Sequence, residues 1–409
     1  MEKSNVVFSF DIWNDQLRPE SEIELWKKTD MMPSVIYYEP QKVALEDLIA
    51  YLDKCEQAGV KVTYLDGRTD FRNMQEGREE EFLKDIETVA RDILWHPAIE
   101  RIQIGDEPHG EYHYKAFIMV AKKLKEVTDK KVGSCFYHWG RGKDFTDYFG
   151  VHPSEYHKVV EKMIVEGQLD YFMFDDYSYM SEYFGEDREN IFFKNMSLFS
   201  ELSKKLKIPA YNCAITTAFQ HYLQPTETDH RWLISTTFAY GMKGVQFYTF
   251  YDLPQKGGFS SITPGLGTGF PIDGNGNTTY AYDDIMRAVG EFKTRFAGEF
   301  EKLEYIESWH YITARGGAKM LFDGDDLFKY FHADHGVPCI VSKFYNKEED
   351  AYAYAIVNLS RTKSEVYIYN FKEPYEEYDN HVWLLPGQMA LVKLYGKAKK
   401  KKAAITGEV

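Results

Sequence analysis

Short apolar runs alternate with amphipathic segments over about the first 250 residues, and this alternation constrains the fold more than any other feature of the sequence. Each run is rich in β-branched and aromatic residues and short enough to be a buried strand. The eight runs cover residues 6–13, 34–40, 61–68, 99–108, 131–139, 169–179, 208–215 and 244–252. Apolar residues at helical spacing fill the intervals, at residues 45–58, 81–94, 112–127, 153–165, 192–206 and 230–240.

Eight strands that alternate with helices predict an α/β fold, a parallel (β/α)8 TIM barrel. A doubly wound open sheet is the alternative, but no GxGxxG turn follows the first run. After the eighth run comes a loop dense in Gly, Pro, Asn and Thr, and then a helical pattern at residues 283–296. We expect that helix to close the barrel.

The pattern changes after about residue 304, where strand-like runs follow one another without helices. These runs lie at residues 307–314, 339–346, 350–360, 364–371, 381–386 and 389–396. They predict a small antiparallel β domain that resembles a sandwich. We therefore expect a barrel over residues 1–300, a β-sandwich-like domain over 301–397, and a flexible basic tail over 398–409.

The charge balance excludes some partners. The 49 Lys and Arg stand against 64 Asp and Glu, which gives a formal net charge of −15, so nucleic acid and anionic membrane surfaces are not expected as main partners. No apolar stretch is long enough for a membrane helix, and no secretory signal is recognisable. The expected location is the cytoplasm, or the periplasm or exterior if a signal was removed. The four cysteines, which are widely spaced, are expected to be free thiols.

In a barrel of this kind, function lies at the carboxyl ends of the strands. Six of the eight predicted strand ends carry a carboxylate, each preceded by mostly apolar residues. Like charges crowded into a concave site raise some pKa values, and a carboxylic acid can then stay protonated near neutral pH.

The segment IQIGDEPHG at the end of the fourth run is the sharpest local signal. Asp106 and Glu107 stand between a glycine and a proline, and Pro108 cannot continue a strand. The backbone must therefore bend here, and both acids can reach the barrel mouth. The alternative is that one of them only caps the following helix.

Two further segments supply candidate site residues. FMFDDYSY offers two acids and a hydroxyl to grip sugar hydroxyls or a positive centre, and HWGRG offers a tryptophan for stacking, with an alternative role in packing for each. The predicted catalytic residues are Glu107, Asp106, Asp175 and Asp176. The predicted substrate-binding residues are Asp11, Trp13, Glu39, Asp66, His138, Trp139, Tyr177, Tyr211, Asn212, Tyr248 and Asp252.

Metal and acyl-transfer chemistry find little support in the sequence. His109 and His113 stand four residues apart, but HGEYH lacks the acid that follows the first histidine in HExxH. No serine lies in a GxSxG turn. We therefore predict no metal site and no cofactor.

The chain resembles bacterial glycoside hydrolase barrels in GDEP at the fourth strand, in the connection FPIDGNGNTTYAYDDI, and in the C-terminal segments AYAIVNLS and WLLPGQMALVKL. Clan A glycosidases carry a nucleophilic glutamate at strand seven, where this chain reads IPAYNCAITT without a carboxylate. Substrate-assisted hexosaminidases of glycoside hydrolase families 20 and 123 instead use adjacent Asp and Glu at strand four. That resemblance implies Glu107 as general acid and base, and Asp106 as the residue that orients a 2-acetamido group.

The sequence thus predicts a hydrolase of glycosidic bonds, with an oligosaccharide or polysaccharide as its partner. In the alternative, Asp175 or Asp176 would meet the positive charge at the sugar ring, and the substrate would be a plain hexoside. A glycan-binding protein on a glycosidase-like scaffold is the second hypothesis, favoured by the missing acid at strand seven. A metal-dependent hydrolase is the third. The sugar, the linkage and the oligomeric state are left open.

Overall fold

The structure is a computed structural model, and it describes residues 6–14, 17–182, 186–218, 221–251, 269–322, 325–375, 380–395 and 404–406. The predicted site residue Asp252 lies outside these ranges, and the side chain of Trp13 is not described. Within these ranges, no helix is long and apolar enough to cross a lipid bilayer.

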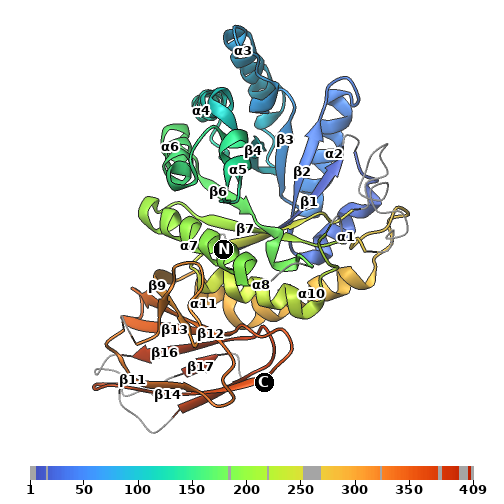
Figure 1. Cartoon of the computed structure of the whole chain (residues 1–409). Coiled ribbons are helices and arrows are strands. Elements are labelled where there is room, and N and C mark those ends of the chain that lie inside the picture. Colours follow the sequence, from blue (N-terminus) through green and yellow to red (C-terminus); the bar gives the residue numbers. More distant parts are fainter. Residues whose placement is uncertain are drawn as a thin grey trace.

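Eight parallel strands form a closed barrel, which confirms the predicted TIM barrel (Figure 1). Each strand pairs with its neighbours in chain order, and β1 pairs with β8 to close the ring. The strands are β1 (Val7–Asn14), β2 (Met32–Tyr38), β3 (Val62–Asp66), β4 (Ile99–Asp106), β5 (Lys131–Tyr137), β6 (Tyr171–Asp175), β7 (Ala210–Ile215) and β8 (Gly244–Tyr248).

The helices follow the predicted amphipathic segments. In α2, Leu48, Leu52 and Cys55 are buried on one face, and Gly59 ends the helix in the left-handed conformation. The helices of the barrel are α1 (Ser21–Thr29), α2 (Leu45–Ala58), α3 (Glu79–Val89), α4 (Gly110–Val127), α5 (Lys143–Phe149), α6 (Tyr156–Gly167), α7 (Glu186–Leu206), α8 (Glu227–Ala239) and α10 (Tyr280–Phe292). The sequence analysis did not predict α1 and α5. The π-helical turns Ala90–Leu94 and Lys293–Ala297 extend α3 and α10, and the short α11 (Gly298–Phe300) follows.

The C-terminal strands form two sheets. The first has the order β10-β9-β12-β13-β16-β17 and the second the order β11-β14-β15. Their bounds are β9 (Leu303–Tyr311), β10 (Lys319–Met320), β11 (Phe328–Ala333), β12 (Cys339–Asn346), β13 (Ala351–Asn358), β14 (Glu365–Phe371), β15 (Asn380–Leu384), β16 (Met389–Tyr395) and β17 (Ala404–Thr406). All pairings are antiparallel except that of β10 with β9. Side chains from both sheets form one buried apolar cluster, and β17 belongs to the stretch that was predicted as a tail.

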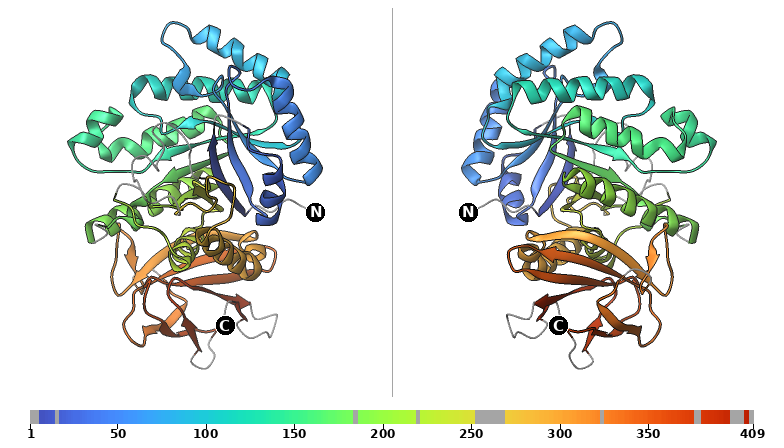
Figure 2. Two further views of the ribbon diagram at one scale, coloured as in Figure 1. Left: turned by 90° about the vertical axis from the view of Figure 1, so that its right-hand side faces the viewer. Right: turned by 90° about the vertical axis from the view of Figure 1, so that its left-hand side faces the viewer.

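Helix α8 lies between the barrel and the first C-terminal sheet (Figures 1 and 2). Nearly every residue of α8 from Asp229 to Ala239 is buried. The barrel's apolar cluster continues into β12, β13 and β16 through residues such as Ile340, Ala355 and Leu391. A helix that is buried on all sides marks a single continuous core.

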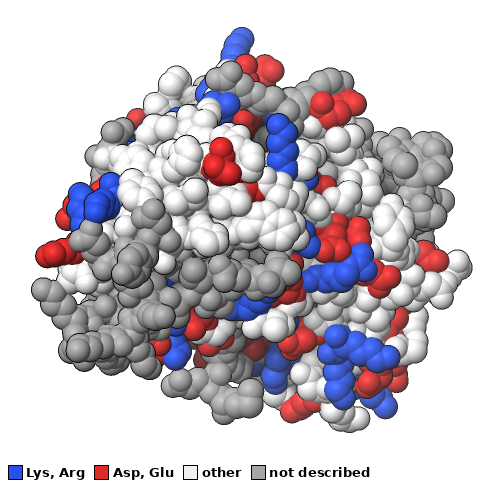
Figure 3. Space-filling model, turned by 90° about the horizontal axis from the view of Figure 1, so that it is seen from below, with Lys and Arg blue, Asp and Glu red and all other residues white. Residues whose placement is uncertain are grey.

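The view from below looks onto the C-terminal sheets (Figure 3). Lys and Arg side chains lie among Asp and Glu side chains over the described part of this face, which also has a broad uncharged area. No concentrated basic area stands out there, in keeping with the net charge of −15.

Candidate active site

Four acids from three strands gather at the carboxyl-terminal mouth of the barrel. They are Asp11 on β1, Asp106 at the end of β4, Glu107 directly after it, and Asp175 at the end of β6. The charges of Glu107 and Asp106 act on Asp175, and the charges of Asp11 and Asp106 act on Tyr248, so these groups lie close to one another. We call Asp11, Asp106, Glu107 and Asp175 the mouth acids.

A backbone irregularity brings the two adjacent acids of β4 to the same place. The register of β4 against β5 shifts between Gln103 and Asp106, and Gly105 has a φ of 104°. A Cβ atom on Gly105 would lie 2.5 Å from Oδ1 of Asp70, so only glycine fits there. Glu107 has a φ of 46°, and its N–H donates to the carbonyl oxygen of Cys135 at 3.0 Å. The bulge cancels the alternation that would otherwise separate the two side chains.

Burial raises the pKa of three of the mouth acids, and repulsion from neighbouring acids adds to this effect at Asp106 and Asp175. Burial, followed by the charge of Glu107, raises the pKa of Asp106 to about 7, although the Arg72 guanidinium opposes this shift. Burial also raises the pKa of Asp11 to about 7, against hydrogen bonds from Ser34 and Gln246 that lower it. These are carboxyls that can exchange protons near neutral pH.

Asp175 shows the strongest effect of the four. Burial and the charges of Glu107 and Asp106 raise the pKa of Asp175 well above its usual value. Its buried Oδ1 has no hydrogen-bond donor. Burial and the neighbouring acids therefore favour the neutral form of Asp175.

Tyrosine rings surround the mouth acids. Tyr177 and Tyr248 lie nearly parallel, with ring centroids 6.1 Å apart and an interplanar angle of 12°. Burial first, and the charge of Asp175 second, raises the pKa of Tyr177 and of Tyr137, so both stay protonated. The ring of His138 stacks on Tyr137 at 4.1 Å, and its Nδ1 lies 3.0 Å from the carbonyl oxygen of Asp175.

Two predicted site residues, Asp66 and Asp176, have side chains that are bonded to other parts of the protein. Asp66 is fully buried and accepts from Arg68 and from the hydroxyl of Tyr64. Asp176 is fully buried as well: it caps the turn at Tyr177–Met180 and accepts from Asn195 at 2.8 Å.

Asn212 donates to Thr237 of α8, on the helix side of the barrel wall. Its neighbour Tyr211 belongs to a cluster inside the barrel, where Arg101 lies 4.9 Å from its ring centre. The two residues face opposite sides because side chains alternate along a strand.

The remaining predicted residues lie outside the group of mouth acids. Trp139 is 7% exposed, and its Nε1 donates to the carbonyl oxygen of Pro153 at 2.9 Å. Glu39 forms a surface ion pair with Lys42 at 3.0 Å. The structure thus brings together Asp11, Asp106, Glu107, Asp175, Tyr177, Tyr248 and His138 from the predicted set.

Sequence reasoning missed several residues at the mouth. Tyr137 ends β5 directly before His138, and its aromatic character was a usable signal. Arg72 follows β3 in a short turn, where it binds Asp70 at 2.9 Å and acts on Asp106. Tyr148 lies on the unpredicted helix α5, so no pattern in the sequence pointed to it.

One group of side chains has the composition of a metal site. Ligand atoms of Asp53, Glu56 and His96 lie within 4.8 Å of one another in the described part of the chain. The N–H of Ala98 donates to Nδ1 of His96 at 3.1 Å, which puts the ring proton on Nε2, where it faces Asp53. A metal would need a lone pair at Nε2, so this arrangement is that of a hydrogen-bonded histidine.

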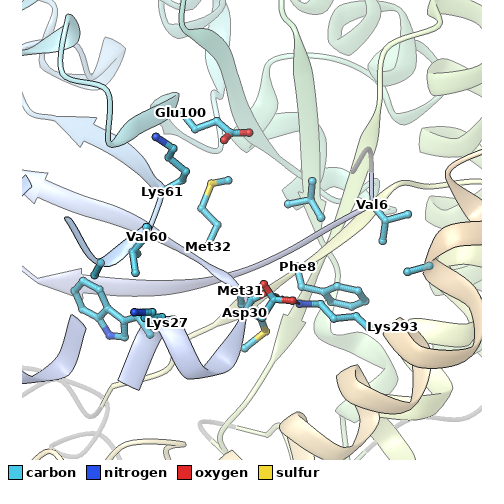
Figure 4. A pocket seen from close by; sticks show the side chains of 15 residues that line it. Val6, Phe8, Lys27, Asp30, Met31, Met32, Val60, Lys61, Glu100 and Lys293 are labelled. Carbon is cyan, nitrogen blue, oxygen red and sulfur yellow. Dashed lines mark hydrogen bonds and ion pairs between the residues drawn. The ribbon is translucent and has the colours of Figure 1, made fainter. Parts of the chain in front are cut away.

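A cavity of about 790 Å³ lies at the opposite end of the barrel, beside the starts of β1, β2 and β3 (Figure 4). Three of its charged groups are engaged with one another or with the backbone: Lys293 binds Asp30, and Lys61 donates to the carbonyl oxygen of Pro97 at 2.8 Å. None of the mouth acids lines this cavity. Its position at the amino-terminal end is that of a structural feature in barrels of this kind.

No family model matches the sequence, and no curated protein matches it. The structure is similar to that of a β-galactosidase from the psychrophilic Marinomonas ef1, with a TM-score of 0.54 at 11% identity, over 73% of this chain and 62% of that one. It is also similar to β-galactosidases from Rahnella sp. R3 (TM-score 0.53, 12% identity, 73% and 57% covered) and from the haloarchaeon Halorubrum lacusprofundi (TM-score 0.52, 11% identity, 70% and 58% covered).

The chain spans less than two thirds of the length of these β-galactosidases. A likeness at this level of identity shows the fold. The chain therefore has a (β/α)8 barrel of the type that glycosidases use.

Proposed function

We propose that the protein is a glycoside hydrolase in which Glu107 protonates the departing glycosidic oxygen and later activates water. The observation that carries the proposal is the group of buried acids at the carboxyl-terminal mouth of the barrel, where Glu107 lies beside Asp106 and Asp175 and both neighbours have raised pKa values. Asp106 and Asp175, whose pKa values are raised, are the neighbours that would supply Glu107 with the proton it donates.

The protonation of Asp175 argues against a nucleophilic role for this residue. A carboxyl nucleophile must be ionised, whereas burial and the charges of Glu107 and Asp106 favour the neutral form of Asp175. Strand β7 carries no carboxylate.

A substrate-assisted route fits the remaining acid. Asp106 lies next to Glu107, and its ionised form would accept a hydrogen bond from the N–H of a 2-acetamido group on the sugar. The amide oxygen would then form a bond to the anomeric carbon while the glycosidic bond breaks and Glu107 gives its proton to the leaving oxygen. Water, deprotonated by Glu107, would open the resulting ring. We therefore propose N-acetylhexosaminides as the substrate class.

A panel of aryl glycosides, with and without the 2-acetamido group, tests this function. Wild type should turn over at least one N-acetylated member, and Glu107→Gln should lose about 10²- to 10⁴-fold in kcat/KM. The loss should be smallest with the most acidic phenol, because such a leaving group needs no proton. Glu111→Gln is the matched control, because Glu111 is an exposed acid four residues away.

The role of Asp106 has its own test. Replacing the acetyl group of the substrate by trifluoroacetyl weakens the amide oxygen as a nucleophile, so kcat/KM should fall steeply for wild type. Equal rates with both substrates would contradict the substrate-assisted route. No turnover of any glycoside, together with measurable sugar binding, would favour a glycan-binding protein, a function that the missing carboxylate on β7 also favours.

A further inference from the structure

Tyr148 is an exposed aromatic residue beside the mouth acids. It lies near the end of α5, and 50% of its surface is accessible. Most other tyrosines near the mouth keep less exposure, and Tyr148 takes no part in the proposed chemistry. Its exposed ring is therefore free to contact a ligand at the rim of the barrel.

The ring of Tyr148 is held in place on one side. It stacks on His109 with centroids 4.3 Å apart and planes 19° apart. His109 is itself fixed, since its Nδ1 lies 3.0 Å from the carbonyl oxygen of Glu107 and its ring meets His113 edge-on at 4.5 Å. Phe149, which is buried, anchors the helix below Tyr148. One face of Tyr148 is covered, and the rest of the ring is open to solvent.

The position of Tyr148 relative to the acids indicates which part of a substrate it would meet. The charges of Glu107 and then Asp106 act on Tyr148 and help raise its pKa, after burial. Tyr148 stacks on His109, and His109 contacts the carbonyl oxygen of Glu107, so the ring of Tyr148 lies beside the proposed proton donor. A proton donor faces the glycosidic oxygen, which belongs to the leaving group.

We propose that Tyr148, stacked on His109, is the platform for the sugar on the leaving-group side of the cleaved bond. This proposal rests on the proposed function and names its preferred substrate as an oligosaccharide. The flat apolar face of a pyranose would pack on the open side of the ring, and His109 would keep the ring oriented. Tyr148 is a substrate-binding residue here and takes no part in proton transfer.

Equilibrium binding measures the contribution of Tyr148 to sugar affinity without relying on turnover. Calorimetry with the Glu107→Gln protein compares N-acetylglucosamine with its β-1,4-linked disaccharide, lactose with galactose, and cellobiose with glucose. At least one disaccharide should bind about five- to tenfold more tightly than its monosaccharide, the range expected for one aromatic contact. Adding Tyr148→Ala should remove that difference, and Tyr148→Phe should keep it.

Kinetics provide the second measurement. A glycosyl fluoride has no sugar or ring on the leaving-group side, so Tyr148→Ala should leave its kcat/KM unchanged while lowering that of the disaccharide by about five- to tenfold. His109→Ala should give a smaller loss of the same kind, because it loosens the platform. Trp383→Ala is the control, since Trp383 is 48% exposed on β15, away from the barrel.

The outcomes separate the two proposals. If Tyr148→Ala leaves the disaccharide preference intact, or lowers fluoride and disaccharide hydrolysis equally, the platform is refuted while the hydrolase proposal stands. If no mono- or disaccharide binds, the platform is refuted as well. If wild type binds disaccharides through Tyr148 but hydrolyses neither them nor the fluoride, the platform stands and the hydrolase proposal fails.

Discussion

Asp66 and Asp106 are the last residues of the neighbouring strands β3 and β4, but the charges around them differ in sign. At the end of β3, Asp66 accepts from Arg68 at 2.8 and 3.0 Å and from Tyr64 at 2.7 Å. At the end of β4, the charge of Glu107 acts most strongly on Asp106, and the Arg72 guanidinium compensates it only in part. The first acid is neutralised by a fixed cation, and the second is neutralised by taking up a proton.

The difference shows how a barrel separates structural from chemical carboxyls. A paired carboxylate stays ionised and contributes to stability, whereas crowded, weakly paired acids lower stability and become available for proton transfer. The residue type does not decide whether a carboxyl is ionised or protonated, since both residues are aspartates at strand ends. The neighbouring side chains decide its protonation.

Asp66→Ala should have the largest effect on stability. It leaves the Tyr64 hydroxyl without its partner and leaves Arg68 only the longer ion pair with Asp92 at 3.8 Å, so the free energy of unfolding should fall by about 3 kcal/mol. Chemical denaturation measures this. Glu39→Ala, which removes a surface ion pair with Lys42, should cost less than about 1 kcal/mol. Similar losses in the two variants would show that the end of β3 is not stabilised by its ion pair.

Asp106→Asn should change how stability depends on pH. Because the folded-state pKa of Asp106 is raised to about 7, the folded protein binds more protons than the unfolded chain between about pH 4 and 7. Wild type therefore loses stability as pH rises through this window, and the variant avoids that loss. The advantage of the variant should grow by about 2–3 kcal/mol from pH 4 to pH 7.

Denaturation curves across that range provide the measurement for Asp106→Asn. Asp144→Asn, which changes an exposed acid of α5, should follow wild type throughout. An advantage of Asp106→Asn that shrinks with rising pH would contradict the raised pKa.

Gly105→Ala should disturb the bulge that joins the two acids of β4. The φ of 104° and the 2.5 Å approach to Asp70 predict a loss of about 2 kcal/mol, together with reduced activity as Asp106 and Glu107 shift. Gly77→Ala is the matched control: its φ is 83° and nothing lies within 4 Å of the added Cβ. If Gly105→Ala is no more harmful than Gly77→Ala, the steric argument fails.

Asp175→Asn should change stability least. Burial and the charges of Glu107 and Asp106 favour the neutral form of Asp175, so the amide replaces a neutral group of the same shape, and the free energy of unfolding should move by less than about 1 kcal/mol. Activity should nonetheless fall, because the amide cannot supply a proton to Glu107. A stability loss near that of Asp66→Ala would mean that Asp175 is ionised and paired.

The barrel could be predicted because the local pattern of apolar residues determines its strands and most of its helices. All eight strands overlap the predicted runs, and α2 matches its predicted bounds of 45–58. Helix α5 was missed because its seven residues are too few to show a periodic apolar face. Strands β10 and β11 were missed as well, and β10 has only two residues. The domain boundaries stay predictions.

The site was predictable only where the local backbone determines it. The sequence GDEP required a bend, and the structure has it at Gly105. Asp176 could not be distinguished from Asp175 by sequence, because its partner Asn195 comes from α7, nineteen residues later. The catalytic roles assigned to the mouth acids remain predictions for the kinetic tests above.

Helix α8 has a consequence for evolution and for engineering of the molecule. It is enclosed by barrel strands on one side and by β12 and β13 on the other. A chain that ended before β9 would expose the apolar surface of α8 that now packs against the sheet, and such a fragment would aggregate. The C-terminal sheets thus serve as part of the outer wall of the barrel. The barrel and the C-terminal sheets must therefore be expressed and redesigned as one unit.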